Sequence, residues 1–354
     1  MTTVIALDVG HSAVKCIADS PSGRQQVVFP SVATAALELS EENARRVAAR
    51  ETVEVDGRKF FFGDTAILQG IVDSESGLND NWITTLQYSA LVSGAFLKLR
   101  TSPYPITTDD AIIVVGLPAK HLDGQKALLV EVMKKLAPNA KIAVLPQPMG
   151  PFMCIQFNDR GELSTHHKVG NESWGIIEIG HYTTDFGIVR NGLWVDKNSD
   201  SCSGAHIVVK QVAKRIKDEF GHALTMVEAT KAVVEGHVMD FGKMVSIQPF
   251  ITESLQLLTD EVIDTANRLI DREARGLNGI VVAGGAAQLL FPLLHAKYKH
   301  AIMSDDSRMT VAEGFYRFGC AQRIKLNKSA ERERDRAAAA AAAAAPATAG
   351  QAAG

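Results

Sequence analysis

The chain has 354 residues, of which 46% are hydrophobic and 22% are charged, and its formal net charge is −3. This length suggests about two domains, and this composition supports a packed core. The small negative charge argues against a strong nucleic-acid-binding surface of its own, although DNA could still be bound through an adaptor protein.

The cysteines and the apolar runs indicate where the protein works. The cysteines are far apart and lack metal-ligand spacing, so we expect reduced thiols rather than a zinc site or disulfides. No apolar run reaches the ~18–20 residues of a membrane span, and the N-terminus lacks the pattern of a signal peptide. We therefore expect a cytoplasmic protein without a membrane partner. The cysteines are Cys16, Cys154, Cys202 and Cys320.

The first half of the chain alternates strands with helices. Asp56-Gly57, between alternating apolar positions, is a strong hairpin signal. The alternation predicts an α/β protein with a parallel or mixed sheet whose faces are covered. The expected elements are strands at 3–9, 13–18 and 25–30, a hairpin at 51–62, a helix at 81–100, a strand at 110–116, a helix at 123–136 and a strand at 142–145.

The second half repeats this plan, with Asn191-Gly192 as a tight turn and Pro249 near the start of a long helix. After it, residues 328–354 contain nine consecutive alanines. Nine residues are fewer than the ~12–15 that an isolated helix needs, so we expect a disordered tail. The expected elements are strands at 176–179, 185–190 and 193–197, a helix at 205–220, a long helix within 245–275, a strand at 279–283, and helices at 286–294 and 309–324.

Both halves also contain the same short motif. An apolar run ends in an acidic residue, any residue, glycine and histidine, and a turn then leads into a second apolar run. The glycine lets backbone N–H groups approach an anion. Two such turns facing each other would hold a polyphosphate between two carboxylates, which suggests a nucleotide clamped between two similar domains. The motifs are Asp8-Val9-Gly10-His11 and Glu178-Ile179-Gly180-His181.

With the late glycine pair Gly284-Gly285, these turns make the chain resemble the actin, heat-shock chaperone and sugar-kinase ATPase superfamily. Its size makes it most similar to the ParM/StbA group of bacterial plasmid-segregation actins. The resemblance implies an actin-like ATPase fold, in which two similar ribonuclease-H-like domains flank a nucleotide cleft. Further supporting motifs are Val144-Leu145-Pro146-Gln147-Pro148, Gly116-Leu117-Pro118 and Thr310-Val311-Ala312-Glu313-Gly314-Phe315-Tyr316.

The resemblance also implies domain bounds. Actin-like domain I would cover residues 1–160, with a small subdomain at about 19–75, and a C-terminal helix at 309–327 would complete it. Actin-like domain II would cover residues 161–308, and residues 328–354 would form the alanine-rich tail.

The implied ligands are Mg²⁺ and ATP, with GTP as an alternative. Asp8 and Gln147 would bind Mg²⁺ mainly through water, because Mg²⁺ keeps several waters. Plain alternatives stay open: a turn or cap role for Asp8, a solvated strand lysine for Lys15, and a simple strand-to-helix turn at Gly284-Gly285. The expected nucleotide-binding residues are Asp8, Gly10, His11, Ser12, Lys15, Gly180, His181, Tyr182, Thr183, Gly204, Gly284, Gly285 and Ala286.

The expected catalytic residues are Glu178, Gln147 and Asp185. An amide is a poor base, so Gln147 would position the attacking water, and Glu178 would accept its proton or polarise it. Asp185 would complete the water shell of the metal, or it would only bond its own turn. Glu178 stands where most relatives have Asp, and Gly180-His181-Tyr182 stands where many have consecutive glycines.

The implied function is an ATPase that polymerises into dynamic filaments and moves plasmid DNA through an adaptor at a centromere-like site. The partners would be further copies of the chain and this adaptor, without direct nucleic-acid binding. The alternatives are a small-molecule kinase or ATP-dependent regulator of the same fold, and a chromosomal cell-shape actin homologue.

Overall fold

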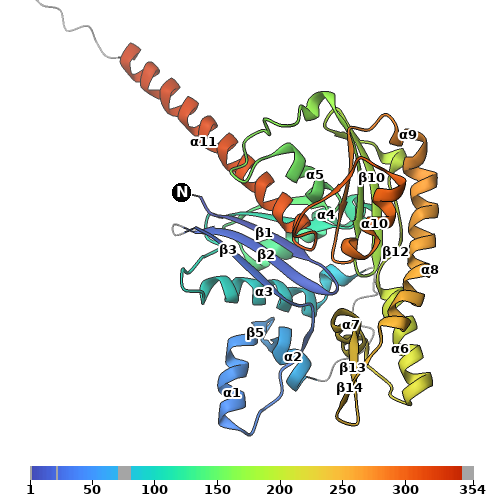
Figure 1. The fold of residues 1–354 in the computed structure, drawn as a ribbon. Coiled ribbons are helices and arrows are strands. Elements are labelled where there is room, and N and C mark those ends of the chain that lie inside the picture. Colours follow the sequence, from blue (N-terminus) through green and yellow to red (C-terminus); the bar gives the residue numbers. More distant parts are fainter. Residues whose placement is uncertain (1, 21–22, 71–80, 345–354) are drawn as a thin grey trace, which may run out of the picture.

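The computed structural model describes residues 2–20, 23–70 and 81–344, and it contains a duplicated α/β unit (Figure 1). The first sheet, sheet A, has the strand order β3-β2-β1-β7-β8. β1 pairs with β2 antiparallel and with β7 parallel. All of β1 is buried, so it reads as a continuous apolar run ending in Asp8-Val9. The bounds are β1 Val4–Val9, β2 Ala13–Ser20, β3 Gly23–Pro30, β7 Ile112–Leu117 and β8 Lys141–Pro146.

The second sheet, sheet D, repeats this topology with the order β11-β10-β9-β15-β16, and β12 also pairs with β10. β9 pairs with β10 antiparallel and with β15 parallel, as β1 does with β2 and β7. Two mixed sheets of equal topology confirm the predicted actin-like α/β fold. The bounds are β9 Ser173–Ile179, β10 Thr183–Arg190, β11 Leu193–Trp194, β12 Asp200–Ser203, β15 Gly279–Ala283 and β16 Ala301–Met303.

Helices cover both faces of each sheet. In sheet A, α3 and α4 supply Leu91 and Leu129 to one core, and α11 supplies Phe315 to the core on the other face. In sheet D, α6, α8 and α10 cover one face, and α5 packs Phe152 against the other. The bounds are α3 Leu86–Arg100, α4 Leu122–Leu136, α5 Met149–Gln156, α6 His206–Phe220, α8 Gln248–Ala266, α9 Arg272–Ala274, α10 Ala287–Lys297 and α11 Thr310–Ala344.

The helices α5 and α11 exchange sides. α5 follows β8 of sheet A but packs on sheet D, and α11 follows β16 of sheet D but packs on sheet A. We call sheet A with its covering helices domain I, and sheet D with its covering helices domain II. The two exchanged helices contact each other, so they form the junction between the domains.

Each domain carries a small insertion. The insertion of domain I contains the predicted Asp56-Gly57 hairpin, and both of these turn residues have positive φ. The insertion of domain II ends in a hairpin that lies at the bottom of Figure 1. The bounds in domain I are β4 Ala33–Ala35, α1 Glu42–Ala48, β5 Thr52–Val55, β6 Arg58–Phe62 and α2 Gly63–Gln69, and those in domain II are α7 Met226–Glu235, β13 His237–Asp240 and β14 Lys243–Ser246.

The long helix expected within 245–275 is present and starts at Gln248, because Val245 pairs with Val238 in the hairpin and Pro249 occupies the first turn of α8. A π-helical turn, Asn267–Asp271, then joins α8 to α9. The strand expected at 193–197 is only Leu193–Trp194, because Asp196–Asn198 form a 3₁₀ turn.

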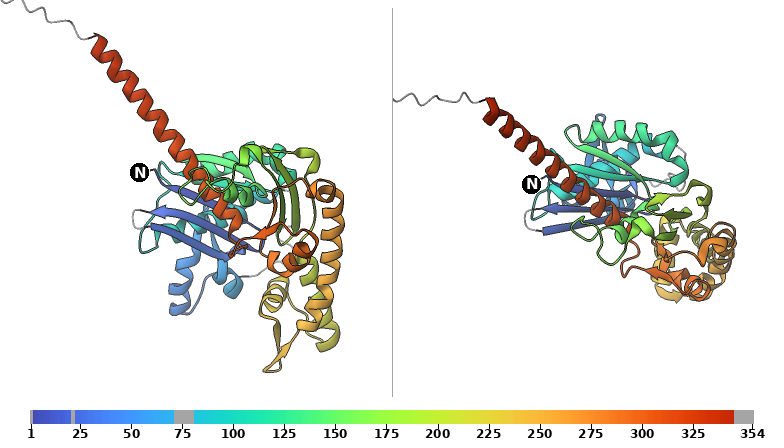
Figure 2. Two further views of the ribbon diagram at one scale, coloured as in Figure 1. Left: turned by 45° about the horizontal axis from the view of Figure 1, so that its top comes forward. Right: turned by 90° about the horizontal axis from the view of Figure 1, so that it is seen from above.

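The expected disorder of the tail is wrong for residues 328–344, because α11 continues to Ala344 and extends away from the body (Figure 2). The length limit for an isolated helix does not apply here. Val311, Phe315 and Tyr316 pack the start of α11 on sheet A, so the helix is already nucleated and further residues only propagate it. The rest of the predicted tail, 345–354, lies outside the described residues. Within the described part of the chain, no helix is long and apolar enough to cross a membrane.

Candidate nucleotide site

The first turn of the repeated motif places Asp8 in a network of hydrogen bonds. Asp8, at the end of β1, is 2% exposed. Its cross-strand partner Lys15 lies with Nζ 2.7 Å from Asp8 Oδ2, and Gln147 Nε2 donates to Asp8 Oδ1 at 3.1 Å. Gln147 comes directly after β8, in the same sheet. The structure therefore brings together three of the predicted site residues, and the carboxylate of Asp8 is paired rather than isolated.

The second turn has the same geometry and a different charge. Glu178 pairs with Asp185 across β9 and β10, as Asp8 pairs with Lys15 across β1 and β2. Both carboxylates are buried, at 7% and 2% exposure. Asp185 accepts a hydrogen bond from Thr183 Oγ1 at 2.9 Å, so it does bond its own turn. The cross-strand partner of Asp8 is the cation Lys15, whereas the partner of Glu178 is another acid, Asp185.

Burial is the main reason why the pKa values of both acids are raised. Burial, then the charges of Asp185 and Asp8, raise the pKa of Glu178 to about 8, and Lys15 opposes the shift. Burial raises the pKa of Asp185 to about 6, against the hydrogen bond from Thr183 and the charge of Lys120. Without a bound cation, Glu178 is thus largely protonated at neutral pH. A cation placed between these carboxylates would favour the charged forms.

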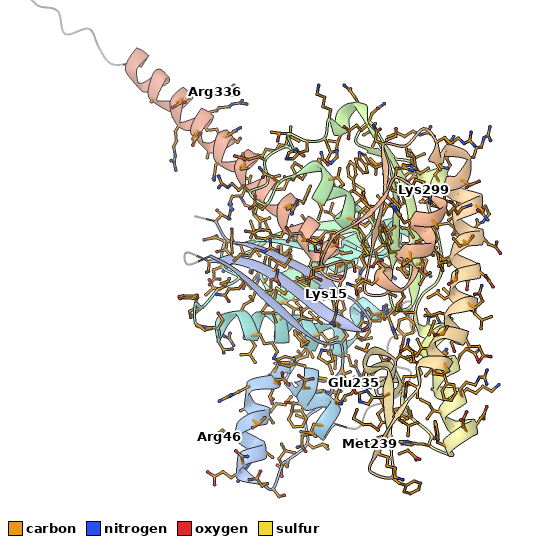
Figure 3. All side chains as sticks on the ribbon, in the orientation of Figure 1. Lys15, Arg46, Glu235, Met239, Lys299 and Arg336 are labelled. Atoms are coloured by element: carbon orange, nitrogen blue, oxygen red, sulfur yellow. The ribbon has the colours of Figure 1, made fainter. Side chains whose placement is uncertain are left out.

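The two turns face each other across the domains. The ring of His11 lies 4.8 Å from that of Tyr182, edge to face, and stacks on Trp82 at 5.6 Å. On the domain II side, the ring of His206 lies 5.2 Å from that of Tyr182, and His181 also contacts both rings. Burial and the neighbouring histidines His206 and His11 lower the pKa of His181 to about 4, so its ring is neutral. An aromatic row therefore crosses from the turn at Gly10-His11 to the turn at Gly180-His181. Figure 3 shows Lys15 in this central region of the molecule.

Gly204 packs directly under the second turn. Its N–H donates to Tyr182 O at 2.8 Å, and the next two N–H groups donate to Gly180 O and His181 O. A Cβ on Gly204 would lie 2.6 Å from His181 O, so only glycine fits. In this structure the first amides of α6 bond the turn itself, which makes Gly204 a support for the turn rather than a direct phosphate donor.

The glycine pair after β15 lies beside the same turn. Gly284 has φ +100°, and a Cβ there would lie 2.3 Å from Ile179 O. Ala286 N donates to the same oxygen at 3.2 Å. The Cβ position of Gly285, in contrast, has no atom within 4 Å. Gly284 thus anchors the turn to the end of β9, and Gly285 leaves open space where a flat ring could approach the backbone.

The donor set fits Mg²⁺ held together with a nucleotide. Among the described residues, no group of three or more His, Cys, Asp or Glu side chains is arranged to cage a metal ion directly. Carboxylate and amide oxygens of Asp8, Glu178, Asp185 and Gln147 nevertheless converge on this region. Mg²⁺ typically binds through one or two carboxylates, waters and substrate phosphates, which is what such a sparse set of oxygens could support.

Three residues near the site were not identified from the sequence. His206 was not among the expected site residues, but its ring lies in the aromatic row. Trp82 was read as part of a helix, and Lys120 follows the expected Gly116-Leu117-Pro118 motif without a signal of its own. Lys120 belongs to the 3₁₀ turn Ala119–His121 of domain I and acts electrostatically on Asp185 of domain II. Only the packing of the two domains brings these residues to the site.

Comparisons with known proteins agree with this architecture. The family model "Actin like proteins N terminal domain" matches residues 6–150, and "Archaeal actin homologue MreB-like, C-terminal" matches residues 176–296. The search of curated proteins found no match. The two family matches coincide with the two halves that carry the repeated turn motif.

Solved structures share the fold at low sequence identity. A 15-stranded ParM filament from Clostridium botulinum has a TM-score of 0.72 at 20% identity, covering 90% of this chain and 99% of that one. The archaeal actin homolog Ta0583 in complex with ADP has a TM-score of 0.66 at 18% identity, covering 89% and 98%. MreB5 of Spiroplasma citri bound to ADP has a TM-score of 0.60 at 18% identity, covering 93% and 99%.

The repeated sheets and their facing turns define a two-domain protein of the actin-like fold. Each of its two halves is similar to a family model of actin-like proteins.

Proposed function

We propose that this protein is an actin-like ATPase whose Mg·ATP-bound form assembles into filaments that disassemble after hydrolysis. The carrying observation is the pair of phosphate turns, with Asp8 and Glu178 at equivalent strand ends and the rings of His11 and Tyr182 in contact between them. A triphosphate between the turns would touch both domains. Loss of its γ-phosphate would remove contacts that favour the closed arrangement.

The residues of the site have separable roles in this proposal. The N–H groups of the turn at Gly10–Ala13 and the charge of Lys15 would hold phosphate oxygens. Gln147 donates its amide nitrogen to Asp8, which leaves its amide oxygen as the acceptor that can orient a water. Glu178, once it is ionised beside Mg²⁺, would take a proton from that water. Asp185 would bind the metal's waters.

The proposed task is segregation of plasmid DNA through an adaptor protein. The fold is shared with a ParM filament, and the net charge of −3 does not favour direct binding to DNA. A filament that grows with ATP and binds the adaptor at a centromere-like site would push or pull its cargo without touching the DNA itself.

The test measures phosphate release and sedimentation together over a series of protein concentrations, with Mg·ATP and with Mg·GTP. We expect both signals to rise steeply above one threshold concentration, with filaments visible by electron microscopy. The control is the same series with EDTA. Hydrolysis proportional to protein concentration, without sedimenting material, would instead favour a monomeric kinase or regulator.

A further inference from the structure

The hairpin at the end of the domain II insertion has an unusual turn. Three hairpins in the described chain have two-residue turns in which both residues have positive φ: Asp56-Gly57, Asn191-Gly192 and Phe241-Gly242. Such turns favour Asn or Asp first and Gly second, because short polar side chains tolerate this conformation. The first two turns follow this rule. The third places a bulky aromatic residue, with φ +42°, where it is strained.

The side chain of Phe241 gains nothing from this position within its own molecule. It is 99% exposed. Beyond the pair Asp240–Lys243 that flanks the turn, the cross-strand pair Met239 and Met244 is also exposed, at 54% and 66%. We call these three side chains the hairpin tip. A strained backbone and an exposed apolar cluster stabilise neither the hairpin nor the core, so both point to an external partner.

A hollow of about 460 Å³ lies at the other end of domain II. α8 begins next to the hairpin and leads into the π-turn and α9, which form one wall of the hollow. The opposite walls come from residues that directly precede β15 and β16, at the strand ends remote from the nucleotide site. At ~1.5 Å per residue, α8 alone separates the tip from the hollow by roughly 28 Å. Figure 3 shows this separation through Met239 at the bottom and Lys299 at the upper right.

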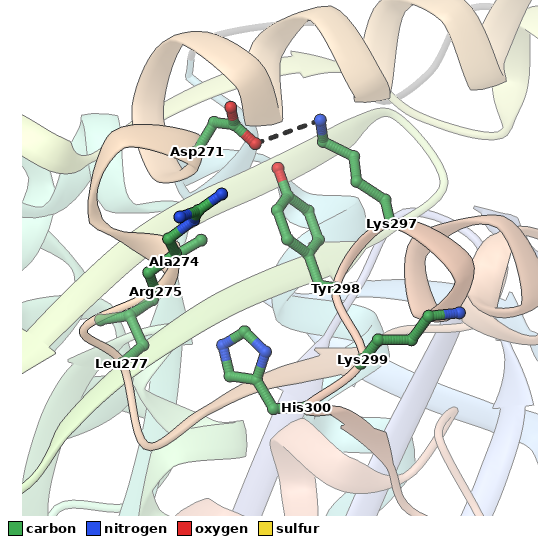
Figure 4. Close-up of a pocket in the computed structure, with 8 residues that line it drawn as sticks. All are labelled: Asp271, Ala274, Arg275, Leu277, Lys297, Tyr298, Lys299 and His300. Atoms are coloured by element: carbon green, nitrogen blue, oxygen red, sulfur yellow. Dashed lines mark ion pairs between the residues drawn. The ribbon is translucent and has the colours of Figure 1, made fainter.

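The hollow presents aromatic and cationic groups. Arg275 points toward the ring of Tyr298, and Lys299 and His300 form another side (Figure 4). Among the described residues, Arg275 and Lys299 have no ion-pair partner, whereas Lys297 is paired with Asp271 at 3.1 Å. The buried His300 Nε2 also lacks a hydrogen-bond partner within the described chain. The hollow therefore offers unpaired cations beside an aromatic ring.

We infer that the hairpin tip of one subunit inserts into this hollow of the next subunit in the proposed filament. The ring of Phe241 would stack on the guanidinium of Arg275, and the carboxylate of Asp240 beside it would pair with Arg275 or Lys299. The tip and the hollow lie at opposite ends of one domain, so a molecule cannot satisfy both by itself. A contact between different surfaces of identical subunits that does not close into a ring gives an open chain. This inference rests on the proposed function and names its longitudinal contact.

The first experiment uses Phe241→Asn, which installs the residue that this turn favours. We expect an unchanged or higher melting temperature, together with a critical concentration for Mg·ATP-dependent sedimentation that rises at least tenfold. Leu193→Asn is the matched control, because Leu193 is 72% exposed beside the Asn191-Gly192 turn and lies outside the contact. Its critical concentration should equal that of the wild type. Wild-type assembly by Phe241→Asn would overturn the inference.

The second experiment pairs the two surfaces. Arg275→Glu should also block assembly. This variant has an intact hairpin tip, whereas the Phe241→Asn variant has an intact hollow. Mixed together with Mg·ATP, the two variants should form a 1:1 complex in analytical ultracentrifugation and nothing longer, while each alone stays monomeric. The double variant Asp240→Lys with Arg275→Glu should recover part of the assembly. Absence of the mixed complex would show that the two surfaces do not meet.

These outcomes separate the contact from the proposed function. If the wild type fails to sediment with Mg·ATP or Mg·GTP, the filament proposal is wrong and the contact falls with it. If the wild type sediments, and Arg275→Glu blocks assembly while Phe241→Asn does not, only the contact is wrong.

Discussion

Gly314 of α11 lies against the backbone of Gly150 of α5, where the two exchanged helices cross. A Cβ built on Gly314 would lie 1.7 Å from Gly150 O, and a Cβ on Gly150 would lie 2.7 Å from the Cα of Val311. No side-chain rotation can relieve either clash, because the opposing atoms are backbone. The junction between the domains is therefore set by the close approach of two helix backbones.

The Gly314→Ala variant should consequently be strongly destabilised. Overpacking a tight contact commonly costs ~1–3 kcal/mol, and here the helices must also separate. Chemical denaturation of the nucleotide-free protein would measure this. Gly124→Ala, in α4 with nothing within 4 Å of its Cβ position, is the control and should be neutral or stabilising by ~0.5–1 kcal/mol. Equal stabilities of the two variants would contradict the proposed crossing.

The free energy of unfolding of the nucleotide-free protein should fall as pH rises between about 5 and 8. Folded Glu178, with its pKa raised from 4.5 to about 8, keeps a proton that the unfolded chain releases. The native state therefore binds more protons in this window, and linkage makes stability decrease by up to ~1.4 kcal/mol per pH unit for one proton. Glu178→Gln should flatten this dependence in urea denaturation across the same pH range. If the free energy of unfolding depended on pH equally steeply in Glu178→Gln, the proton would belong to a group other than Glu178.

Glu178→Ala should bind Mg·ATP and hydrolyse it slowly, so that filaments persist. Loss of a group in general acid–base catalysis commonly costs ~10²–10⁴-fold. Phosphate release after a single turnover gives the rate, and sedimentation over hours shows persistence. Thr184→Val, buried in the neighbouring strand β10 and bonded to Ser203 O rather than facing the carboxylates, is a control that should keep the hydrolysis rate. If Glu178→Ala hydrolysed ATP at the wild-type rate, Gln147 or Asp185 would be the residue responsible for hydrolysis.

Asp8→Ala should lose Mg·ATP binding and also some stability. The second effect follows from Lys15, whose side chain is 12% exposed and would lose its ionic partner at 2.7 Å. Leaving a nearly buried charge unpaired typically costs ~3–5 kcal/mol. The double variant Asp8→Ala with Lys15→Met should regain most of this stability without regaining nucleotide binding. Calorimetry with Mg·ATP and thermal unfolding measure the two effects separately. Tight binding of Mg·ATP by either variant would show that the cleft has been misplaced.

Much of the fold could be predicted from local pattern. The continuous apolar runs that end in Asp8 and Glu178 are strands buried on both faces, and Asp56-Gly57 has the chemistry of its turn. The β13–β14 hairpin was missed because Phe241-Gly242 carries no turn signal. The length of α11 was missed because the packing that nucleates it lies far away in sequence.

The residues of the candidate site could be predicted from the sequence, but their pKa values could not. The spacing of the motifs shows that Asp8 and Glu178 are equivalent, and the register then pairs one with Lys15 and the other with Asp185. The pKa values depend on burial and on charges from the other domain, such as Lys120, which no local pattern contains. The roles of these residues in hydrolysis stay predictions.

The exchange of α5 and α11 also bears on synthesis of the chain. The elements of domain II, with α5 before them, are contiguous in sequence. All of them are available for folding once β16 has left the ribosome. Sheet A, although made first, keeps the face formed by Val4, Ala6 and Val114 uncovered until α11 emerges. The nascent protein must therefore carry an unfinished first domain until the start of α11 has left the ribosome. Sheet A closes last, when Phe315 reaches it, so chains that lack α11 also lack a finished domain I.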